Sequence, residues 1–185
     1  MIPFLEQFAH HYTPAWRTSD AALDCLQAVL EKYKPKSILE LGPGLSSFLF
    51  YRYTTKNPGV SYQVFDHKDS FAYEHQIHVD AAGYSSKNIK ILPLTAGHDY
   101  DFRGEVIYSA DLVFVDGPPD SEARLRLEQT FRAAAFDHSI FLVDDTHRWP
   151  EAELAQLLTR STHSAHRIPD LNFTPRTSTL LVPRC

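Results

Sequence analysis

The chain has 185 residues, a hydrophobic fraction of 43% and a formal net charge of -5, values that suit one folded domain and exclude a disordered chain. The acidic balance argues against a nucleic-acid partner bound through a broad basic face, and no apolar run is long enough to span a bilayer. Because the two cysteines lie far apart and the first residues show no signal-peptide pattern, we expect a cytoplasmic protein without a membrane partner.

Helical periodicity dominates the start of the chain. Apolar residues recur at helical spacing after Ser19, which can cap the N-terminus of a helix that Pro35 ends. A shorter helix is expected at residues 3–11. We expect residues 1–34 to belong to a single domain that spans 1–185, and to serve as a substrate lid or to pack on the domain or on a second copy in a homodimer. The aromatic side chains of this segment that recur four residues apart are Phe4, Phe8, Tyr12 and Trp16.

Short apolar runs alternate with helical segments in the rest of the chain. Such alternation predicts a largely parallel sheet with right-handed crossovers, and a final hairpin adds an antiparallel strand. The fold class is therefore α/β, Rossmann-like, with a mostly parallel seven-stranded sheet, helices on both faces and an antiparallel C-terminal strand. The expected strands are 37–41, 61–65, 89–94, 111–115, 139–143, 163–168 and 178–182. The expected helices between them are 46–53, 69–78, 121–135 and 151–158.

Acidic residues and glycines collect where the expected strands end, the edge at which parallel sheets bind ligands. The loop Gly42-Pro43-Gly44 follows a strand and opens a helix, and its glycines allow the backbone to approach a ligand closely. An acidic edge needs a cationic or hydroxyl-rich ligand, a metal ion or solvation. The acids at the strand ends are Glu40, Asp66, Asp116, Asp144 and Asp145.

Two acids and one serine discriminate among cofactors. Glu40, two residues before the first glycine, would repel the pyrophosphate of NAD, and Ser47 stands where a dehydrogenase prefers a third glycine. S-adenosylmethionine carries a sulfonium and an ammonium group, and a carboxylate favours both. Asp66 ends the next strand, the usual place of an acid that accepts hydrogen bonds from ribose hydroxyls. These residues indicate S-adenosylmethionine as the cofactor.

The segment 38–47 resembles motif I of the class I S-adenosylmethionine-dependent methyltransferases, and the resemblance extends from about Pro35 to the end of the chain. The pattern Val-Asp-Gly-Pro-Pro at 115–119, followed by the acidic pattern at 144–151, resembles a small and poorly characterised subgroup of that family. The family resemblance implies that the glycine loop lies under the methionine part of the cofactor and that the loop around 94–96 contacts adenine. The cofactor-binding residues it implies are Glu40, Gly42, Gly44, Ser46, Ser47, Asp66 and Asp116.

The ends of two neighbouring strands should bring Asp116, Asp144 and Asp145 together. Three carboxylates repel one another unless Mg²⁺, a basic substrate group or raised pKa values neutralise them. The similarity to catechol-type O-methyltransferases implies a Mg²⁺ site of these three residues, although that family usually has an amide in place of Asp145. In the alternative, one acid caps the next helix and Arg148 pairs with Glu151 on the surface.

The loop that should face an acceptor also contains His147. A histidine there can remove a proton from an acceptor hydroxyl during methyl transfer, with Asp144 as the second catalytic residue, or it can simply be a loop histidine exposed to water. The leading function is O-methylation of a small-molecule or sugar hydroxyl. The alternatives are a partner protein that binds the cofactor without catalysis and a phosphoribosyltransferase, although the bulky run 147–149 stands where the latter would cradle a phosphate.

Overall fold

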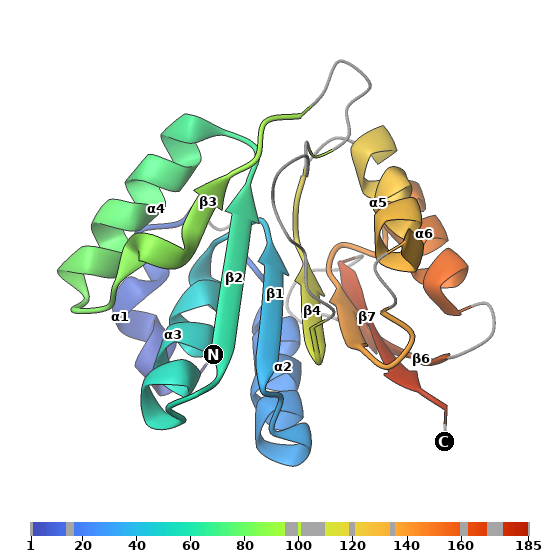
Figure 1. The fold of residues 1–185 in the computed structure, drawn as a ribbon, viewed down its shortest axis with the longest axis horizontal. Helices are drawn as coiled ribbons and strands as arrows, with labels where there is room; N and C mark the ends of the chain where they lie inside the picture. Colours follow the sequence, from blue (N-terminus) through green and yellow to red (C-terminus); the bar gives the residue numbers. More distant parts are fainter. Residues whose placement is uncertain are drawn as a thin grey trace.

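The computed structural model describes residues 2–13, 17–94, 100, 110–118, 121–133, 136–159, 163–169 and 176–184. Its strands are β1 Ser37–Leu41, β2 Ser61–Asp66, β3 Ile89–Ile91, β4 Leu112–Val115, β5 Ile140–Val143, β6 His163–Pro169 and β7 Thr177–Pro183. They form one seven-stranded sheet in the order β3-β2-β1-β4-β5-β7-β6 (Figure 1). The first five strands pair in parallel, whereas β7 runs antiparallel to both β5 and β6. The predicted fold class is confirmed.

Helices cover both faces of this sheet (Figure 1). The helices are α1 Pro3–Ala9, α2 Asp20–Tyr33, α3 Leu45–Lys56, α4 Asp69–Ala81, α5 Ser121–Ala133 and α6 Trp149–Thr159. Because successive side chains of a strand point to opposite faces, Ile38 packs in the core with α1–α4, while Leu39 packs in the core with α5 and α6. Strands β4 and β5 are buried along their whole length, as expected for parallel strands covered on both faces.

Local signals set the ends of the N-terminal helices as predicted. The Ser19 hydroxyl caps α2 by accepting a hydrogen bond from the Ala22 amide at 3.1 Å. At the other end, Lys34 adopts the left-handed conformation with φ 49°, and Pro35 follows it. The expected helix at 3–11 is present as α1. Trp16 lies outside the described residues, so the full aromatic stripe of this segment stays a prediction.

Several element boundaries differ from the expected ones. Strand β3 ends at Ile91, three residues early, and Leu94 instead forms an isolated bridge with Tyr100. Helix α6 begins two residues early at Trp149, because Pro150 fits the first turn, where its missing amide hydrogen bonds nothing. The expected adenine loop extends into 95–96, which lies outside the described residues.

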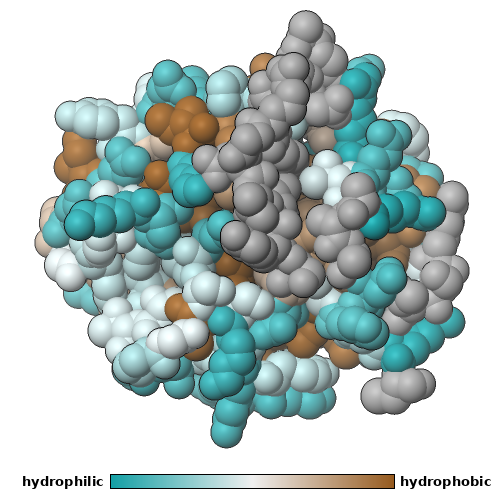
Figure 2. Space-filling model, in the orientation of Figure 1, coloured by the Kyte–Doolittle hydropathy of each residue, from teal (hydrophilic) through white to brown (hydrophobic). Residues whose placement is uncertain are grey.

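The described surface in the view of Figure 2 is mostly hydrophilic, with separate hydrophobic areas between. The most exposed large apolar side chains of the described part include Trp149 and Tyr73, at 68% and 66% exposure. Across the described ranges, no helix has the length and apolar character needed to cross a membrane. The homodimer stays a prediction.

Candidate functional site

The loop after β1 packs directly on the loop after β4. Gly42 has φ +87°, and its amide donates to the Phe65 carbonyl oxygen of β2 at 2.9 Å. A Cβ on Gly42 would stand 2.7 Å from the Gly117 nitrogen, so no larger residue fits there. At Gly44, by contrast, a Cβ would meet nothing within 4 Å. The first glycine therefore joins two strand ends, and the second faces open space.

The carboxylate of Glu40 lies beneath this loop. Glu40 is 0% exposed, and it accepts hydrogen bonds from the Ser46 and Ser47 hydroxyls at 2.5 and 2.6 Å, as well as from the Tyr62 hydroxyl. Ser47 also accepts a hydrogen bond from the Gly44 amide at 3.1 Å. Burial raises the pKa of Glu40 to about 7, although the three hydroxyl donors act in the opposite direction. Glu40, Ser46 and Ser47, which were predicted to bind the cofactor, thus form a buried hydrogen-bond network that fixes the start of α3.

Asp66 stands at the end of β2, next to this loop. It is 5% exposed, accepts a hydrogen bond from the Lys68 amide at 2.9 Å and lies 3.2 Å from Nδ1 of His67. Tyr100 is buried on the same edge, a residue that sequence reasoning missed because its segment shows no periodic pattern. Burial raises the pKa of Tyr100 well above its usual value, and the charges of Asp66 and Asp116 add to the effect. The edge therefore contains a buried phenol close to two acids.

The predicted meeting of acids at the ends of β4 and β5 is present, and Arg176 lies among them. Nη2 of Arg176 is 3.3 Å from Oδ2 of Asp144, and Nε is 2.9 Å from Oδ1 of Asp145. Asp144 is 0% exposed and also accepts a hydrogen bond from the Ser178 hydroxyl at 2.6 Å. Burial and the charge of Asp145 raise the pKa of Asp144, whereas Arg176 and Ser178 lower it. Arg176 thus pairs with both acids that follow β5, and Arg148 pairs with Asp145 as well, at 2.8 Å.

Asp116 contacts the chain segment that precedes α2. Its Oδ2 accepts a hydrogen bond from the Thr18 hydroxyl at 3.1 Å, and the Arg17 carbonyl oxygen accepts one from Nη1 of Arg176 at 2.7 Å. Burial and the charge of Asp144 raise the pKa of Asp116 well above its usual value. Residues 17–18 are therefore held across the ends of β4 and β5.

A buried ion pair lies behind the loop that follows β4. Arg124 of α5, 2% exposed, donates to the carbonyl oxygens of Pro118 and Asp116 at 2.6 and 2.7 Å and lies 3.2 Å from Glu151. Arg148 lies 2.5 Å from the same Glu151 oxygen. The expected pair of Arg148 with Glu151 is present, but Glu151 is 1% exposed rather than on the surface. Glu151 can be buried because Arg124, itself buried, provides a second cation for its carboxylate.

The three predicted Mg²⁺ ligands Asp116, Asp144 and Asp145 do not form a metal site, which corrects the expectation. Among the described residues, no three His, Cys, Asp or Glu side chains are arranged to hold a metal ion. The oxygens of Asp144 and Asp145 contact Arg176, Arg148 and Ser178 instead. Oδ2 of Asp116 accepts a hydrogen bond from Thr18. The residues present therefore do not fit Mg²⁺, and no step is derived through it.

His147 lies at the outer side of the same edge, with its side chain 23% exposed. The acid that the structure brings to it is Asp145, with 3.9 Å between Nδ1 and Oδ1. Asp144, the acid that the sequence paired with His147 for catalysis, is fully buried and contacts Ser178 and Arg176. His147 is therefore accessible to solvent and to a ligand, whereas Asp144 contacts only groups of the protein and positions Ser178 and Arg176.

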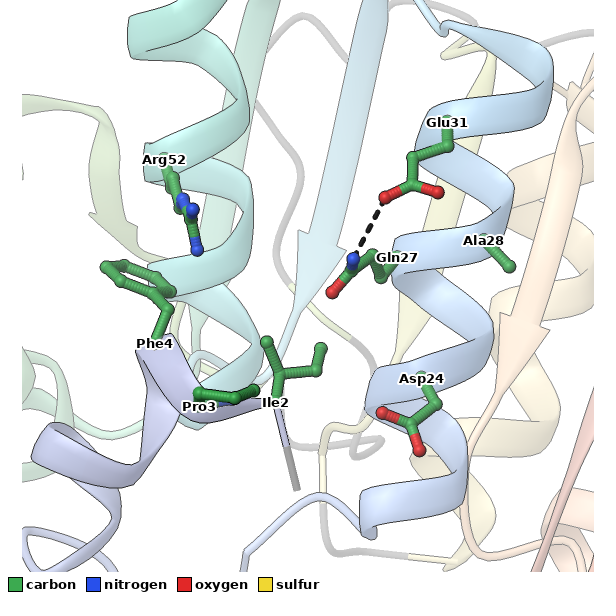
Figure 3. Close-up of a pocket in the computed structure, with 8 residues that line it drawn as sticks. All are labelled: Ile2, Pro3, Phe4, Asp24, Gln27, Ala28, Glu31 and Arg52. Carbon is green, nitrogen blue, oxygen red and sulfur yellow. Dashed lines mark hydrogen bonds between the residues drawn. The ribbon is translucent and has the colours of Figure 1, made fainter.

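A surface pocket of about 620 Å³ lies elsewhere, between α1, α2 and α3 (Figure 3). The Arg52 guanidinium lies over the Phe4 ring there, 4.4 Å from its centroid, and Gln27 donates to Glu31 at 2.9 Å. None of the strand-end residues lines this pocket. We place the functional site at the strand ends because glycines, acids and open backbone converge there.

Comparison with solved structures identifies the fold. The chain is similar to the O-methyltransferase TomG from Streptomyces achromogenes, solved with S-adenosylmethionine (TM-score 0.69, 17% identity, 100% of this chain and 91% of that one). It is also similar to a methyltransferase from Podospora anserina bound to S-adenosylhomocysteine (0.68, 13%, 98% and 87%). A third match is the ribosomal protein L11 methylase from Lactobacillus delbrueckii (0.62, 14%, 89% and 77%).

No protein-family model and no curated protein sequence matches the chain. The solved structures show that the chain has the fold of the class I S-adenosylmethionine-dependent methyltransferases. One of them is named for methylating a ribosomal protein and another is named an O-methyltransferase, so this fold does not determine the acceptor.

Proposed function

We propose that the chain binds S-adenosylmethionine at the ends of β1, β2 and β4 and transfers its methyl group. The observation that carries the proposal is the glycine loop, in which Gly42 is locked against Gly117 while the backbone at Gly44 faces open space. Asp66 lies at the next strand end, as a ribose partner would. This combination leaves room for a cofactor that passes over the loop and reaches the second strand.

Each residue of the loop has a proposed task. The Gly44 backbone lets the methionine part of the cofactor approach, and Asp66 accepts hydrogen bonds from the ribose hydroxyls. Because Glu40 is fully buried, it acts on the cofactor indirectly. Its charge favours the cationic cofactor, and its hydrogen bonds with Ser46 and Ser47 fix the start of α3. Asp116, partly exposed beside the loop, completes the binding edge. The cofactor supplies a methyl group already activated on a sulfonium.

The chemistry left to the chain is alignment of the acceptor and removal of its proton. In-line displacement requires only that nucleophile, carbon and sulfur be held in a row. We propose a small-molecule or sugar hydroxyl as the acceptor and His147 as the group that takes its proton, with Asp145 beside it. Asp144 positions this edge through Ser178 and Arg176.

Calorimetric titration tests cofactor binding. S-adenosylmethionine and S-adenosylhomocysteine should bind in the micromolar range, while NAD and phosphoribosyl pyrophosphate should not. Asp66→Ala should weaken binding by about tenfold or more, because a charged hydrogen-bond partner is lost. Asp69→Ala, an exposed acid three residues further on, is the matched control and should leave the affinity unchanged.

The outcomes separate the candidate functions. No binding of either sulfur compound would overturn the proposal, and a preference for phosphoribosyl pyrophosphate would favour a phosphoribosyltransferase. Tight cofactor binding without methyl transfer to any compound of a broad hydroxyl panel, or to protein extracts, would favour a partner protein without catalysis. Transfer that survives in Asp66→Ala with unchanged affinity would remove the ribose role from Asp66.

A further inference from the structure

The pocket between α1, α2 and α3 has walls of different chemistry (Figure 3). On one side, Arg52 of α3 lies over the Phe4 ring of α1. On the other side, α2 presents polar side chains spaced three and four residues apart, which a helix places on one face. The members of this row are Asp24, Gln27 and Glu31. The pocket therefore has a cation on one wall and acids on the opposite wall.

The opposite charges of this pocket do not meet. Within the described part of the chain, Arg52 forms no ion pair with Asp24 or Glu31 and contacts the Phe4 ring instead. Glu31 accepts a hydrogen bond from Gln27, whereas the Asp24 carboxylate has no hydrogen-bond or ion-pair partner among the described residues. Both acids are exposed and Arg52 is half-buried, so a ligand can reach each of them from solvent. The two walls therefore offer unmatched charges of opposite sign to one ligand.

The size and the apolar lining of the pocket narrow the class of ligand. Its volume of about 620 Å³ lies in the range of pockets that bind small organic molecules. The apolar side chains of Ile2, Pro3 and Ala28 line it between the charged walls. A free α-amino acid carries its ammonium and its carboxylate on the same carbon atom. A short peptide separates these two groups by roughly 3.3–3.6 Å for each residue, so it suits charges that lie on opposite walls.

We propose that this pocket is a second ligand site, which binds a dipeptide or tripeptide as a zwitterion. The ammonium group lies against the acidic wall of Asp24 and Glu31. The terminal carboxylate forms a charge-assisted pair with Arg52, whose guanidinium presents a planar set of donors. An apolar C-terminal side chain packs on Phe4 and Ile2. Because no strand-end residue lines the pocket, this site is separate from the one proposed for methyl transfer and does not depend on it.

Titration with glycyl-leucine, followed by nuclear magnetic resonance of the backbone amides, measures the affinity and the place of binding together. We expect saturable shifts at Gln27, Ala28 and Arg52, with a Kd of about 0.1–1 mM because partly exposed charge pairs contribute little each. The amides of Gly42 and Gly44 should not shift. No saturation up to about 10 mM, or shifts that centre on the glycine loop, would overturn the proposal.

Analogues of the dipeptide test the two charges one at a time. N-acetyl-glycyl-leucine lacks the ammonium group and glycyl-leucine amide lacks the carboxylate, so each should bind about threefold more weakly or worse. Free leucine should lose affinity by a similar factor, because its adjacent charges do not reach both walls. Equal affinity of leucine, or of either blocked dipeptide, contradicts a site for a zwitterion with separated charges.

Substitutions connect each charge of the ligand with one wall. In Arg52→Gln, glycyl-leucine and its amide should bind equally, because the partner of the carboxylate is gone. In the double variant Asp24→Asn with Glu31→Gln, glycyl-leucine and its acetylated form should bind equally. Lys56→Gln removes an exposed cation from the same helix outside the pocket and should preserve both differences. A difference that persists in its own variant would show that the charge binds elsewhere, and the proposal would be wrong.

The two proposals fail separately. Arg52 lies outside the strand-end site, so Arg52→Gln should bind S-adenosylmethionine as tightly as the unaltered chain does. A chain that binds glycyl-leucine in this pocket but no S-adenosylmethionine would keep the second site and lose the methyltransferase. A chain that binds the cofactor and no peptide would do the reverse.

Discussion

Gly42 and Gly117 lie in backbone contact, and a Cβ on Gly42 would stand 2.7 Å from the Gly117 nitrogen. This contact brings the loop after β1 against the loop after β4, strands that neighbour each other in the sheet. Gly44, two residues later, has open space where a Cβ would project. Glycine is therefore required at Gly42 by the backbone contact, whereas at Gly44 it leaves space above the backbone. Substitutions at the two positions can measure this difference.

We expect Gly42→Ala to destabilise the fold and Gly44→Ala to spare it. Gly42 has φ +87° and touches backbone, which cannot move aside, so alanine there should cost about 2–4 kcal/mol. Alanine at Gly44 meets nothing and should cost less than about 1 kcal/mol. It should instead weaken S-adenosylmethionine binding, because its methyl group enters the space proposed for the cofactor. Urea unfolding and calorimetry measure the two effects.

Each glycine variant serves as the control of the other. Equal losses of stability would show that the contact with Gly117 does not distinguish the two positions. A Gly44→Ala variant with full stability and full cofactor affinity would place the ligand elsewhere.

The buried Glu40 should make stability depend on pH. Burial raises its pKa from 4.5 to about 7 in the folded chain, so the folded state holds the proton more tightly than the unfolded state. The stabilising contribution is fully present below pH 4.5 and is lost as the pH rises through 7. The full loss would amount to about 3 kcal/mol, from about 1.4 kcal/mol for each unit of pKa. Glu40→Gln, which cannot titrate, should lack this part of the pH dependence.

Unfolding by urea at several pH values between 5 and 8 measures the effect as a difference between Glu40→Gln and the unaltered chain. Parallel stability curves for the two proteins would contradict the raised pKa. The same variant tests the role of the charge in binding. If the carboxylate favours the sulfonium, Glu40→Gln should weaken S-adenosylmethionine more than S-adenosylhomocysteine, which lacks that charge.

The buried arginine of α5 should matter more than its surface neighbour. Arg124→Met leaves Glu151 with one cation fewer and removes two donors from the loop after β4, so we expect a loss of about 3–5 kcal/mol. Arg126 forms an exposed pair, and Arg126→Ala should cost less than about 0.5 kcal/mol. Because Arg124 holds the Asp116 and Pro118 carbonyl oxygens, Arg124→Met should also reduce cofactor affinity.

A double substitution separates the ion pair from the loop contacts. Adding Glu151→Gln to Arg124→Met should cost less than the sum of the two single losses, because the uncompensated carboxylate is then gone. Additive losses in urea unfolding would show that the two side chains act independently.

The sequence predicted the sheet well because apolar runs, and the glycines and prolines that bound them, are local signals. Every expected strand is present, and the strand ends carry the expected acids. The sequence did not predict that an arginine would be buried, because an interpretation based on apolar periodicity treats charged residues as exposed. In α5, Arg124 is only 2% exposed, as buried as the apolar Leu127 and Phe131 of the same helix.

The acidic edge shows the same limit at longer range. Spacing along the chain correctly placed Asp116 and Asp144 on neighbouring strand ends, but nothing in it showed which cation pairs with Asp144 and Asp145. Arg176 arrives through the pairing of β7 with β5, a contact between residues more than 30 positions apart. The three acids do not fit the predicted metal for a reason of topology, since the charge that compensates Asp144 and Asp145 comes from Arg176, the residue that precedes β7.

The buried histidine of α4 should make the fold sensitive to acid. His75 is 3% exposed, its Nδ1 lies 2.6 Å from the Tyr12 hydroxyl, and burial lowers its pKa to about 3. The unfolded chain takes up a proton near pH 6.5 and the folded chain does not, so stability is present above pH 6.5 and is lost as the pH falls below it. The loss attributable to His75 at pH 5 is about 2 kcal/mol.

His75→Gln should remove this loss, because an amide can still accept the hydrogen bond of the Tyr12 hydroxyl and does not titrate. We expect the unaltered chain to lose about 2 kcal/mol more than His75→Gln between pH 7.5 and pH 5, as measured by urea unfolding. His166→Gln, an exposed histidine of β6, is the control and should follow the unaltered chain. If His75→Gln follows it as well, His75 is protonated in the folded state at pH 5, and the contact with Tyr12 does not depend on a neutral ring.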